Sequence, residues 1–190
     1  MSIKQRILAF LIENKTKAFS IKDISRYLKI DYKLSYINVK KLEEGEIIDV
    51  EDLKNVKRCS FKDRFNEDVF IVETERKNKI LRKKELKAVY DRLKRINKLF
   101  IVLLFGSYVK GTVIKSSDID LLLIADEANA REIESKLEIL PFKIHLTHVH
   151  YDAFIDMIKS KEQSVVSEAI KNNIIFFGVE DYYRLVENAR

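Results

Sequence analysis

A glycine and a serine stand directly after an unbroken apolar run. Residues 99–105 read Leu-Phe-Ile-Val-Leu-Leu-Phe, and Gly106 and Ser107 follow. Such a run is typical of a strand buried on both faces. We expect residues 107–111 to begin a helix, which places unpaired backbone N–H groups and the positive end of the helix dipole at the Gly-Ser pair. Since glycine admits a ligand close to the backbone and the serine hydroxyl adds a hydrogen bond, the pair predicts a phosphate site.

Two aspartates, Asp118 and Asp120, follow in the segment Ser-Ser-Asp-Ile-Asp-Leu-Leu-Leu-Ile. If residues 118–124 form a strand, the alternation of side chains places both carboxylates on one face. Paired hard oxygen ligands beside a phosphate site suit Mg²⁺, which then bridges the protein and the phosphates of a nucleotide. The alternative is that the two acids are ordinary turn residues.

The segment LFGSYVKGTVIKSSDIDLLLIAD resembles the signature of the nucleotidyltransferase superfamily that includes DNA polymerase beta, and in particular its minimal members. The resemblance covers roughly residues 85–185, including the tail NNIIFFGVEDYYRLVE. It implies that Gly106 and Ser107 hold the phosphates of a nucleoside triphosphate, with ATP the expected donor, and that Asp118 and Asp120 hold Mg²⁺ or Mn²⁺. The implied reaction transfers a nucleoside monophosphate to a hydroxyl and releases pyrophosphate.

Two further positions bear on that reaction. Lys110 stands where such proteins often carry a basic residue that binds the triphosphate; a solvated lysine is the alternative. Active members place a third carboxylate on the next strand, which we expect at residues 142–149 (FKIHLTHV). This segment holds no acid, and His145 falls near the expected position, so we count it as a candidate catalytic residue. His148 and His150 share the opposite strand face, so the three histidines do not predict one metal cluster.

Three helical patterns open the chain. Apolar residues recur at three- and four-residue steps over Ile3–Ile12, which predicts a first helix ending near Asn14. Ser20 precedes a second pattern, with Asp23 placed to complete a capping box. Asp31 precedes the third pattern as its expected N-cap.

The third helix is predicted to end at Gly45, and two strands are predicted over residues 47–49 and 57–61. The residues of this helix expected to face inward are Leu34, Val39 and Leu42. This order of elements resembles the winged-helix family of DNA-binding domains over roughly residues 1–62. In that family the third helix enters the major groove, and the hairpin, or wing, contacts the DNA backbone or the minor groove.

The winged-helix resemblance implies double-stranded DNA as a partner. The candidate groove residues are Lys33, Tyr36, Asn38, Lys40 and Lys41, and the candidate wing residues are Lys54, Lys57 and Arg58. The alternative is that these lysines form a solvated face and that the module binds protein. A basic amphipathic helix is expected over residues 79–98, because its apolar stripe is surrounded by lysine and arginine.

Composition limits the classes of protein to which this chain can belong. The chain has 190 residues and a net charge of +6, with 26 Lys and Arg against 16 Asp and Glu in residues 1–98 and 10 against 14 in residues 99–190. The basic half is the half expected to contact nucleic acid. One cysteine excludes an internal disulfide, and no apolar run approaches the roughly 20 residues of a membrane span. We therefore expect a cytoplasmic protein with no membrane partner.

Together these patterns predict an α/β (α+β) protein with a winged-helix domain (1–62), a connector with the basic helix (63–98), and a small nucleotidyltransferase fold with a mixed sheet flanked by helices (99–190). Its predicted activity is metal-dependent nucleotidyl transfer to a hydroxyl of a protein, a nucleic acid or a small molecule. Minimal nucleotidyltransferases often act as antitoxins that modify a protein. The alternative is a weak or inactive nucleotidyltransferase fold in a DNA-binding transcriptional regulator. The oligomeric state stays open, a homodimer included.

Overall fold

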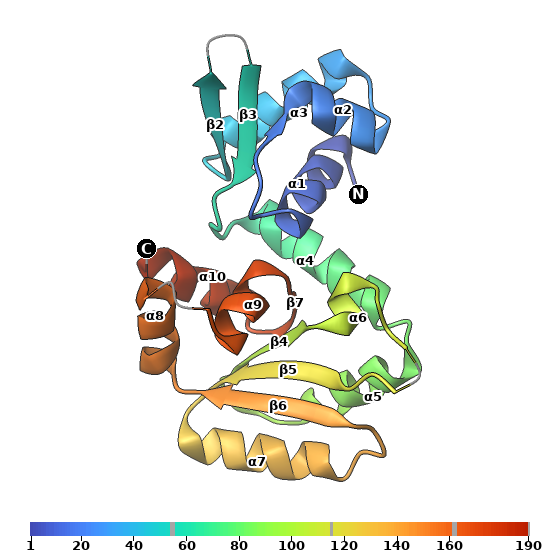
Figure 1. Ribbon diagram of the computed structural model, residues 1–190, viewed down its shortest axis with the longest axis vertical. Helices are drawn as coiled ribbons and strands as arrows, with labels where there is room; N and C mark the ends of the chain where they lie inside the picture. Colours follow the sequence, from blue (N-terminus) through green and yellow to red (C-terminus); the bar gives the residue numbers. More distant parts are fainter. Residues whose placement is uncertain (54–55, 115, 161–162, 190) are drawn as a thin grey trace. The chain divides into compact units, whose positions relative to one another are not determined.

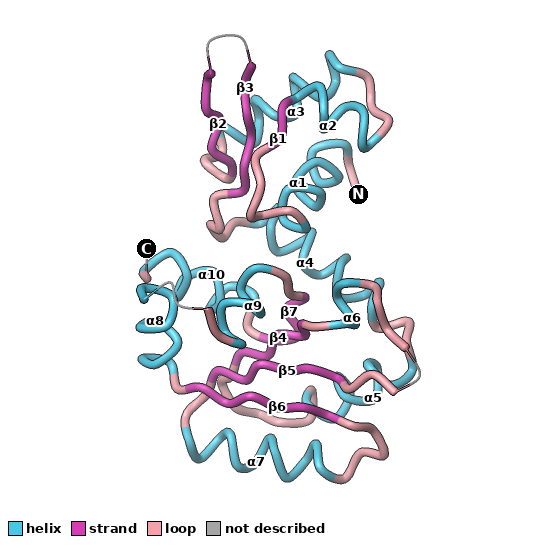
Figure 2. Tube along the Cα trace, in the orientation of Figure 1, coloured by secondary structure: helices cyan, strands magenta, loops and turns pink. Residues whose placement is uncertain are grey.

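The computed structural model describes residues 1–53, 56–114, 116–160 and 163–189, and the chain divides into two compact units, Met1–Thr74 and Glu75–Arg190. Each unit has its own sheet (Figures 1 and 2). Helix α4 (Glu67–Ile80) contains the boundary between them. Within the described residues, no helix has the length and apolar character needed to cross a bilayer.

The first unit begins with helices and ends with a hairpin. Its elements are α1 (Ile3–Glu13), β1 (Phe19–Ser20), α2 (Ile21–Leu28), α3 (Tyr32–Glu44), β2 (Ile48–Leu53) and β3 (Val56–Phe61). The strands form an antiparallel sheet of order β1-β3-β2. The Ser20–Asp23 capping box and the Asp31 cap are both present, and Gly45 caps the end of α3, so the three predicted helices are confirmed. The two predicted strands are also present and paired, but β2 extends to Leu53, four residues beyond its predicted end.

Helix α3 packs differently from the prediction in one respect. Val39 and Leu42 are buried as expected, but Leu34 is 44% exposed and Ser35 is fully buried instead. The prediction for Leu34 is therefore wrong, because the inward face of α3 begins one residue later. The Ser35 hydroxyl has no hydrogen-bond partner among the described residues.

The second unit is a mixed sheet between helices. Its elements are α5 (Lys84–Leu93), β4 (Ile101–Phe105), α6 (Ser107–Lys110), β5 (Ile119–Ile124), α7 (Glu127–Glu138), β6 (Ile144–Val149), α8 (Tyr151–Ser160), α9 (Val165–Lys171), β7 (Ile174–Phe177) and α10 (Val179–Asn188). The strand order is β6-β5-β4-β7, with β5 parallel to β6 and the other two pairs antiparallel.

Both faces of this sheet are covered, which explains the unbroken apolar run of β4. Alternate residues of β4 and β5 pack against apolar side chains of α5 and α7 in one core cluster. The intervening residues, such as Leu103 and Leu122, are fully buried beneath the other face, and α9 and α10 contact β4. The basic helix predicted over residues 79–98 is two elements in the structure, the end of α4 and α5.

Candidate active site

Gly106 ends β4 in a conformation that other residues adopt only with strain. Its φ is +71° and its ψ is −146°, a region essentially restricted to glycine. A Cβ atom at this position would lie 2.1 Å from Oδ2 of Asp120, which is closer than real Cβ contacts come. The missing side chain therefore leaves the space that the Asp120 carboxylate occupies.

Asp120 and His145 are neighbours across the parallel strands. Asp120 on β5 pairs with His145 on β6 in the strand register, and Asp120 also pairs with Phe105 at the end of β4. His145 Nδ1 lies 3.5 Å from Asp120 Oδ1, and the imidazole is 63% exposed while the carboxylate is 25% exposed. The residue opposite Asp120 in the strand register is thus a histidine.

Asp118 lies in the loop before β5 and not in the strand. It is exposed, whereas Asp120 is half-buried. No group of three or more His, Cys, Asp or Glu side chains that could hold a metal ion is present in the described residues. Among the described residues, the carboxylate placed directly against Gly106 is therefore that of Asp120.

The turn after Gly106 is a short helix that begins at Ser107 and ends at Lys110. Val109 and Lys110 donate backbone hydrogen bonds to the Gly106 carbonyl, at 3.2 and 3.1 Å. In the described part of the chain the Ser107 side chain makes no hydrogen bond and no ion pair. Lys110 Nζ lies 2.5 Å from Oε1 of Glu168 on α9, with both side chains about half exposed. Lys110, expected to bind phosphate, therefore has a carboxylate partner.

Sequence reasoning missed Glu168, which is 58 residues from Lys110 and carries no motif. It also missed Tyr108, the buried residue after Ser107. The Tyr108 hydroxyl donates to Glu85 on α5 at 3.3 Å, and Lys83 Nζ lies 4.8 Å from the centre of the Tyr108 ring. Burial raises the pKa of Tyr108 above its ordinary value, with Glu85 adding to the effect, so the phenol stays protonated at neutral pH.

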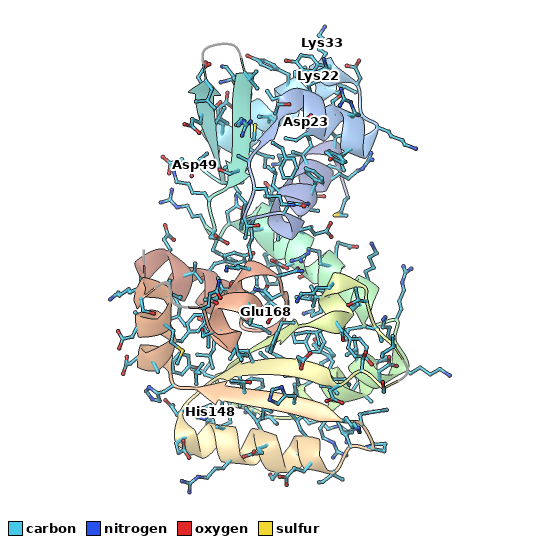
Figure 3. The ribbon with its side chains drawn as sticks, in the orientation of Figure 1. Lys22, Asp23, Lys33, Asp49, His148 and Glu168 are labelled. Atoms are coloured by element: carbon cyan, nitrogen blue, oxygen red, sulfur yellow. The ribbon has the colours of Figure 1, made fainter. Side chains whose placement is uncertain are left out.

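His148 and His150 lie away from the Asp120 pair. His148 Nε2 is 2.9 Å from the Ala125 carbonyl, and His150 Nε2 is 3.4 Å from Asp126. Figure 3 labels His148 on β6 and Glu168 on α9. His148 and His150 thus contact the Ala125–Asp126 segment, whereas His145 contacts Asp120.

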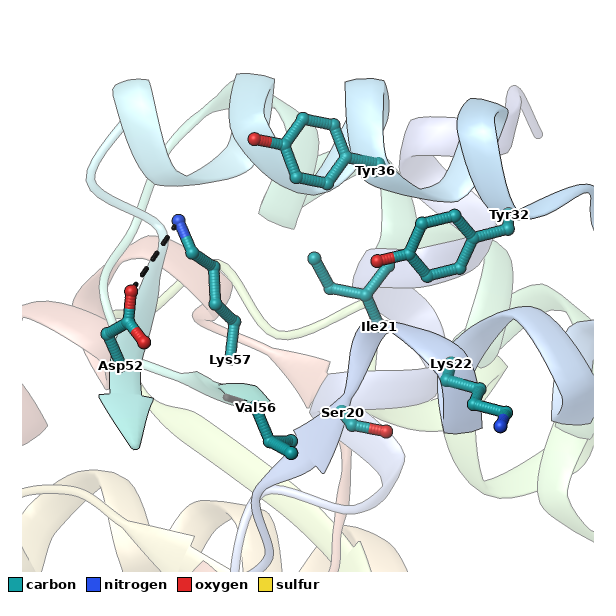
Figure 4. Close-up of a pocket in the computed structure, with 8 residues that line it drawn as sticks. All are labelled: Ser20, Ile21, Lys22, Tyr32, Tyr36, Asp52, Val56 and Lys57. Atoms are coloured by element: carbon teal, nitrogen blue, oxygen red, sulfur yellow. Dashed lines mark ion pairs between the residues drawn. The ribbon is translucent and has the colours of Figure 1, made fainter. Parts of the chain in front are cut away.

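In the first unit, α3 and the hairpin line a hollow of about 590 Å³ (Figure 4). The residues lining it are Ser20, Ile21, Lys22, Tyr32, Tyr36, Asp52, Val56 and Lys57. Lys57 Nζ lies 3.9 Å from Asp52. Tyr36 and Lys57, one from each predicted DNA-binding segment, thus line the same depression.

The other predicted DNA-binding residues differ in whether their side chains already have a partner within the chain. Lys33, Lys41 and Arg58 are exposed. Asn38 donates to the Leu34 carbonyl at 2.8 Å, and Lys40 Nζ lies 2.5 Å from Glu43, whose hydrogen bond raises the pKa of Lys40. Lys54 lies outside the described residues.

Charge is distributed differently from the division into sequence halves. The first unit, residues 1–74, has 15 Lys and Arg against 13 Asp and Glu, a net charge of +2. Residues 75–98 have 11 against 3, a net charge of +8, and they belong to the second unit. Most of the basic surplus therefore lies in α5 and the end of α4.

Comparison with known proteins agrees with the geometry of the second unit. Residues 86–177 match the family model described as nucleotidyltransferase domain. This segment runs from α5 through β7 and includes Gly106, Asp118, Asp120 and His145. Searches of curated proteins and of solved structures gave no match. The match supports the nucleotidyltransferase superfamily for this segment and nucleotidyl transfer as its general activity.

Proposed function

We propose that the second unit transfers a nucleoside monophosphate from a nucleoside triphosphate, with ATP the expected donor, to a hydroxyl acceptor. The observation that carries this proposal is the contact of Gly106 with Asp120. A strained glycine at the end of β4 leaves room for a carboxylate against the backbone, directly before a serine with a free hydroxyl. Phosphate and its countercation are the ligands that such a pairing of groups suits.

The donor set suits a cation that arrives with the nucleotide. Mg²⁺ is commonly held by one or two carboxylates together with substrate phosphates, and Asp118 and Asp120 offer two hard oxygen ligands. When bound, Mg²⁺ or Mn²⁺ would neutralise phosphate charge and polarise the α-phosphate.

In the proposed reaction the acceptor oxygen attacks the α-phosphorus and forms a new P–O bond. The bond between the α-phosphorus and its bridging oxygen breaks, pyrophosphate leaves with the electron pair, and the acceptor proton passes to solvent. Ser107 would donate a hydrogen bond from its hydroxyl to a phosphate oxygen, and Asp118 and Asp120 would hold the cation. Lys110 reaches the triphosphate after parting from Glu168, a half-exposed pair that contributes little to stability.

Titration calorimetry tests this assignment. We expect the full chain to bind a nucleoside triphosphate in the presence of Mg²⁺ or Mn²⁺, and the double variant Asp118→Asn, Asp120→Asn to bind it at least tenfold more weakly. The matched control is Asp156→Asn, because Asp156 is an exposed aspartate on α8. Affinity of the double variant equal to that of the control overturns the assignment of the two aspartates.

We further propose that the first unit is a winged-helix domain that binds double-stranded DNA. Three helices followed by a hairpin support this proposal, as does the hollow shared by α3 and the hairpin. Exposed Lys33, Lys41 and Arg58 supply positive charge on these elements.

A second candidate function is favoured by His145. The resemblance implies a third carboxylate on the strand after Asp120, and on that strand this chain has His145 opposite Asp120, whose imidazole is a poorer ligand for Mg²⁺. A nucleotide-binding but catalytically weak second unit, joined to a DNA-binding first unit, would act as a transcriptional regulator. The acceptor of the first candidate is either a protein, as for an antitoxin, or a nucleic acid.

A further inference from the structure

The α5 basic surface consists of seven exposed cationic side chains on α5 and its flanking residues. They are Lys79, Arg82, Lys84, Lys87, Lys94, Arg95 and Lys98. Lys87 lies 2.8 Å from Asp91, and the other six have no carboxylate partner among the described residues. Because like charges repel, six unpaired cations on so short a segment oppose one another unless an anion covers them.

Two residues that are adjacent to Lys84 of this surface, Lys83 and Glu85, contact Tyr108 beside the proposed active site. Lys83 lies over the Tyr108 ring, and Glu85 accepts the Tyr108 hydrogen bond. Tyr108 itself follows Ser107 in the turn that we assign to phosphate binding. A polyanion that binds along α5 would therefore extend to the Gly-Ser turn.

A hollow of about 730 Å³ lies between the start of α5 and the loop that leads to Asp118. Ile114 and Phe142 give it apolar lining, Ser117 and Lys143 give it polar lining, and Tyr108 and Glu85 are also part of it. The volume is in the range of small-molecule sites, which combine apolar walls with a few polar groups. A terminal nucleotide presents matching chemistry, with apolar base faces, hydroxyls and a phosphate.

The surface fits a nucleic acid better than a protein or a membrane. Residues 75–98 expose no large apolar side chain, whereas protein interfaces have an apolar centre. The apolar side of α5 cannot enter a bilayer, because Leu86, Val89 and Leu93 are fully buried in the core of the unit. Closely spaced cations without apolar anchors are typical of surfaces that follow a phosphate backbone.

We infer that the acceptor is a nucleic acid strand, which binds along the α5 basic surface with its end in the hollow beside Asp118. This inference rests on the proposed nucleotidyl transfer and names its acceptor. The hydroxyl at the end of the strand supplies the attacking oxygen, so the strand is extended by one nucleotide while pyrophosphate leaves.

The test compares three full-length proteins: the wild type, a variant with Arg82→Gln, Lys84→Gln and Lys94→Gln, and a control with Lys136→Gln, Lys159→Gln and Lys171→Gln. Each variant removes three positive charges from exposed positions of the second unit, so the net charge of the two variants is equal. The probe is a labelled single-stranded 20-residue RNA or DNA, whose affinity is measured by fluorescence anisotropy between about 50 and 300 mM salt.

We expect the α5 variant to bind at least tenfold more weakly than the wild type, and its slope of log affinity against log salt to fall by about 2, since each phosphate contact to a single strand contributes about 0.7. The control should resemble the wild type. Equal binding by the two variants, or no binding of either strand by the wild type, overturns the inference.

Calorimetry with metal and triphosphate on the same proteins tests the proposed function separately, because neither variant alters Gly106, Ser107, Asp118 or Asp120. Triphosphate bound equally by all three proteins, together with loss of strand binding in the α5 variant, supports the inference. A wild type that binds the strand but no triphosphate overturns nucleotidyl transfer, and with it the role of the strand as an acceptor. Transfer of α-phosphate label to a strand with a free 3′ hydroxyl, and none to a strand blocked there, supports the acceptor assignment, whereas label found only on protein overturns it.

Discussion

Replacing Gly106 with alanine should damage the site in two ways. The backbone conformation is one that alanine adopts only at a cost of about 1–3 kcal/mol. In addition, the new Cβ would lie 2.1 Å from Asp120 Oδ2, where real contacts stay beyond 3.0 Å, so the carboxylate must move by about 0.9 Å. Since a displacement of about 1 Å in a reacting group can cost about 100-fold in rate, we expect transfer to fall by about 100-fold.

Gly111→Ala is the matched control for this substitution. Gly111 also has a positive φ, +74°, but a Cβ there meets nothing within 4 Å. We expect it to lower the free energy of unfolding by about 1 kcal/mol and to leave metal-dependent triphosphate binding intact. Denaturant unfolding of both variants measures the cost of backbone strain, which the two share. Calorimetry measures triphosphate binding, which only the contact of the new Cβ with Asp120 should weaken. Triphosphate affinity that is unchanged in Gly106→Ala, or lowered equally in both variants, would refute the contact with Asp120 as the basis of the site.

Three further predictions concern His145, the Lys40–Lys41 pair and Cys59. Replacing His145 with Asp should raise Mg²⁺-supported transfer by about tenfold or more, because a carboxylate is a harder ligand, while the wild type should prefer Mn²⁺; fast Mg²⁺ turnover that is lost in the variant would show the opposite. Replacing Lys40 and Lys41 with Ala should weaken duplex DNA binding and lower its salt slope by about 1–2; unchanged binding would argue against α3 as the groove helix. Burial raises the pKa of the fully buried Cys59 to about 11, so its thiol should react with a disulfide reagent at pH 8 only on unfolding, and its contribution to stability should decline as the pH rises toward 11; rapid reaction in the folded protein would contradict this.

Local signals in the sequence predict local structure well. The Ser20–Asp23 capping box requires only residues that are three positions apart, and the structure contains it. The run that becomes β4 reflects burial on both faces of a sheet, which apolar side chains alone report. The apolar alternation over residues 142–149 predicts a strand, and the structure has β6 at Ile144–Val149; that His145 lies opposite Asp120 is seen only in the register.

Contacts between residues far apart in the chain, and the boundary between the two units, could not be predicted from the sequence. The Lys110–Glu168 pair joins two short helices that only the folded sheet brings together. The burial of Ser35 in place of Leu34 depends on how α3 is rotated on α1, which a helical period leaves uncertain by one residue. The boundary after Thr74 lies inside α4, and no glycine or proline marks it in the sequence. The sequence therefore places the basic residues 75–98 in the N-terminal half of the chain, although they belong to the second unit.

We propose that the second unit transfers a nucleoside monophosphate with Asp120 in its active site. The most direct measurement incubates the full chain with α-phosphate-labelled triphosphate, Mn²⁺ or Mg²⁺ and a total cellular extract of macromolecules, and follows the label and the released pyrophosphate together. We predict one pyrophosphate released for each label attached, with both lost in Asp120→Asn and retained in Asp156→Asn. Transfer that persists in Asp120→Asn, or triphosphate that the wild type binds but never cleaves in either metal, would contradict the account.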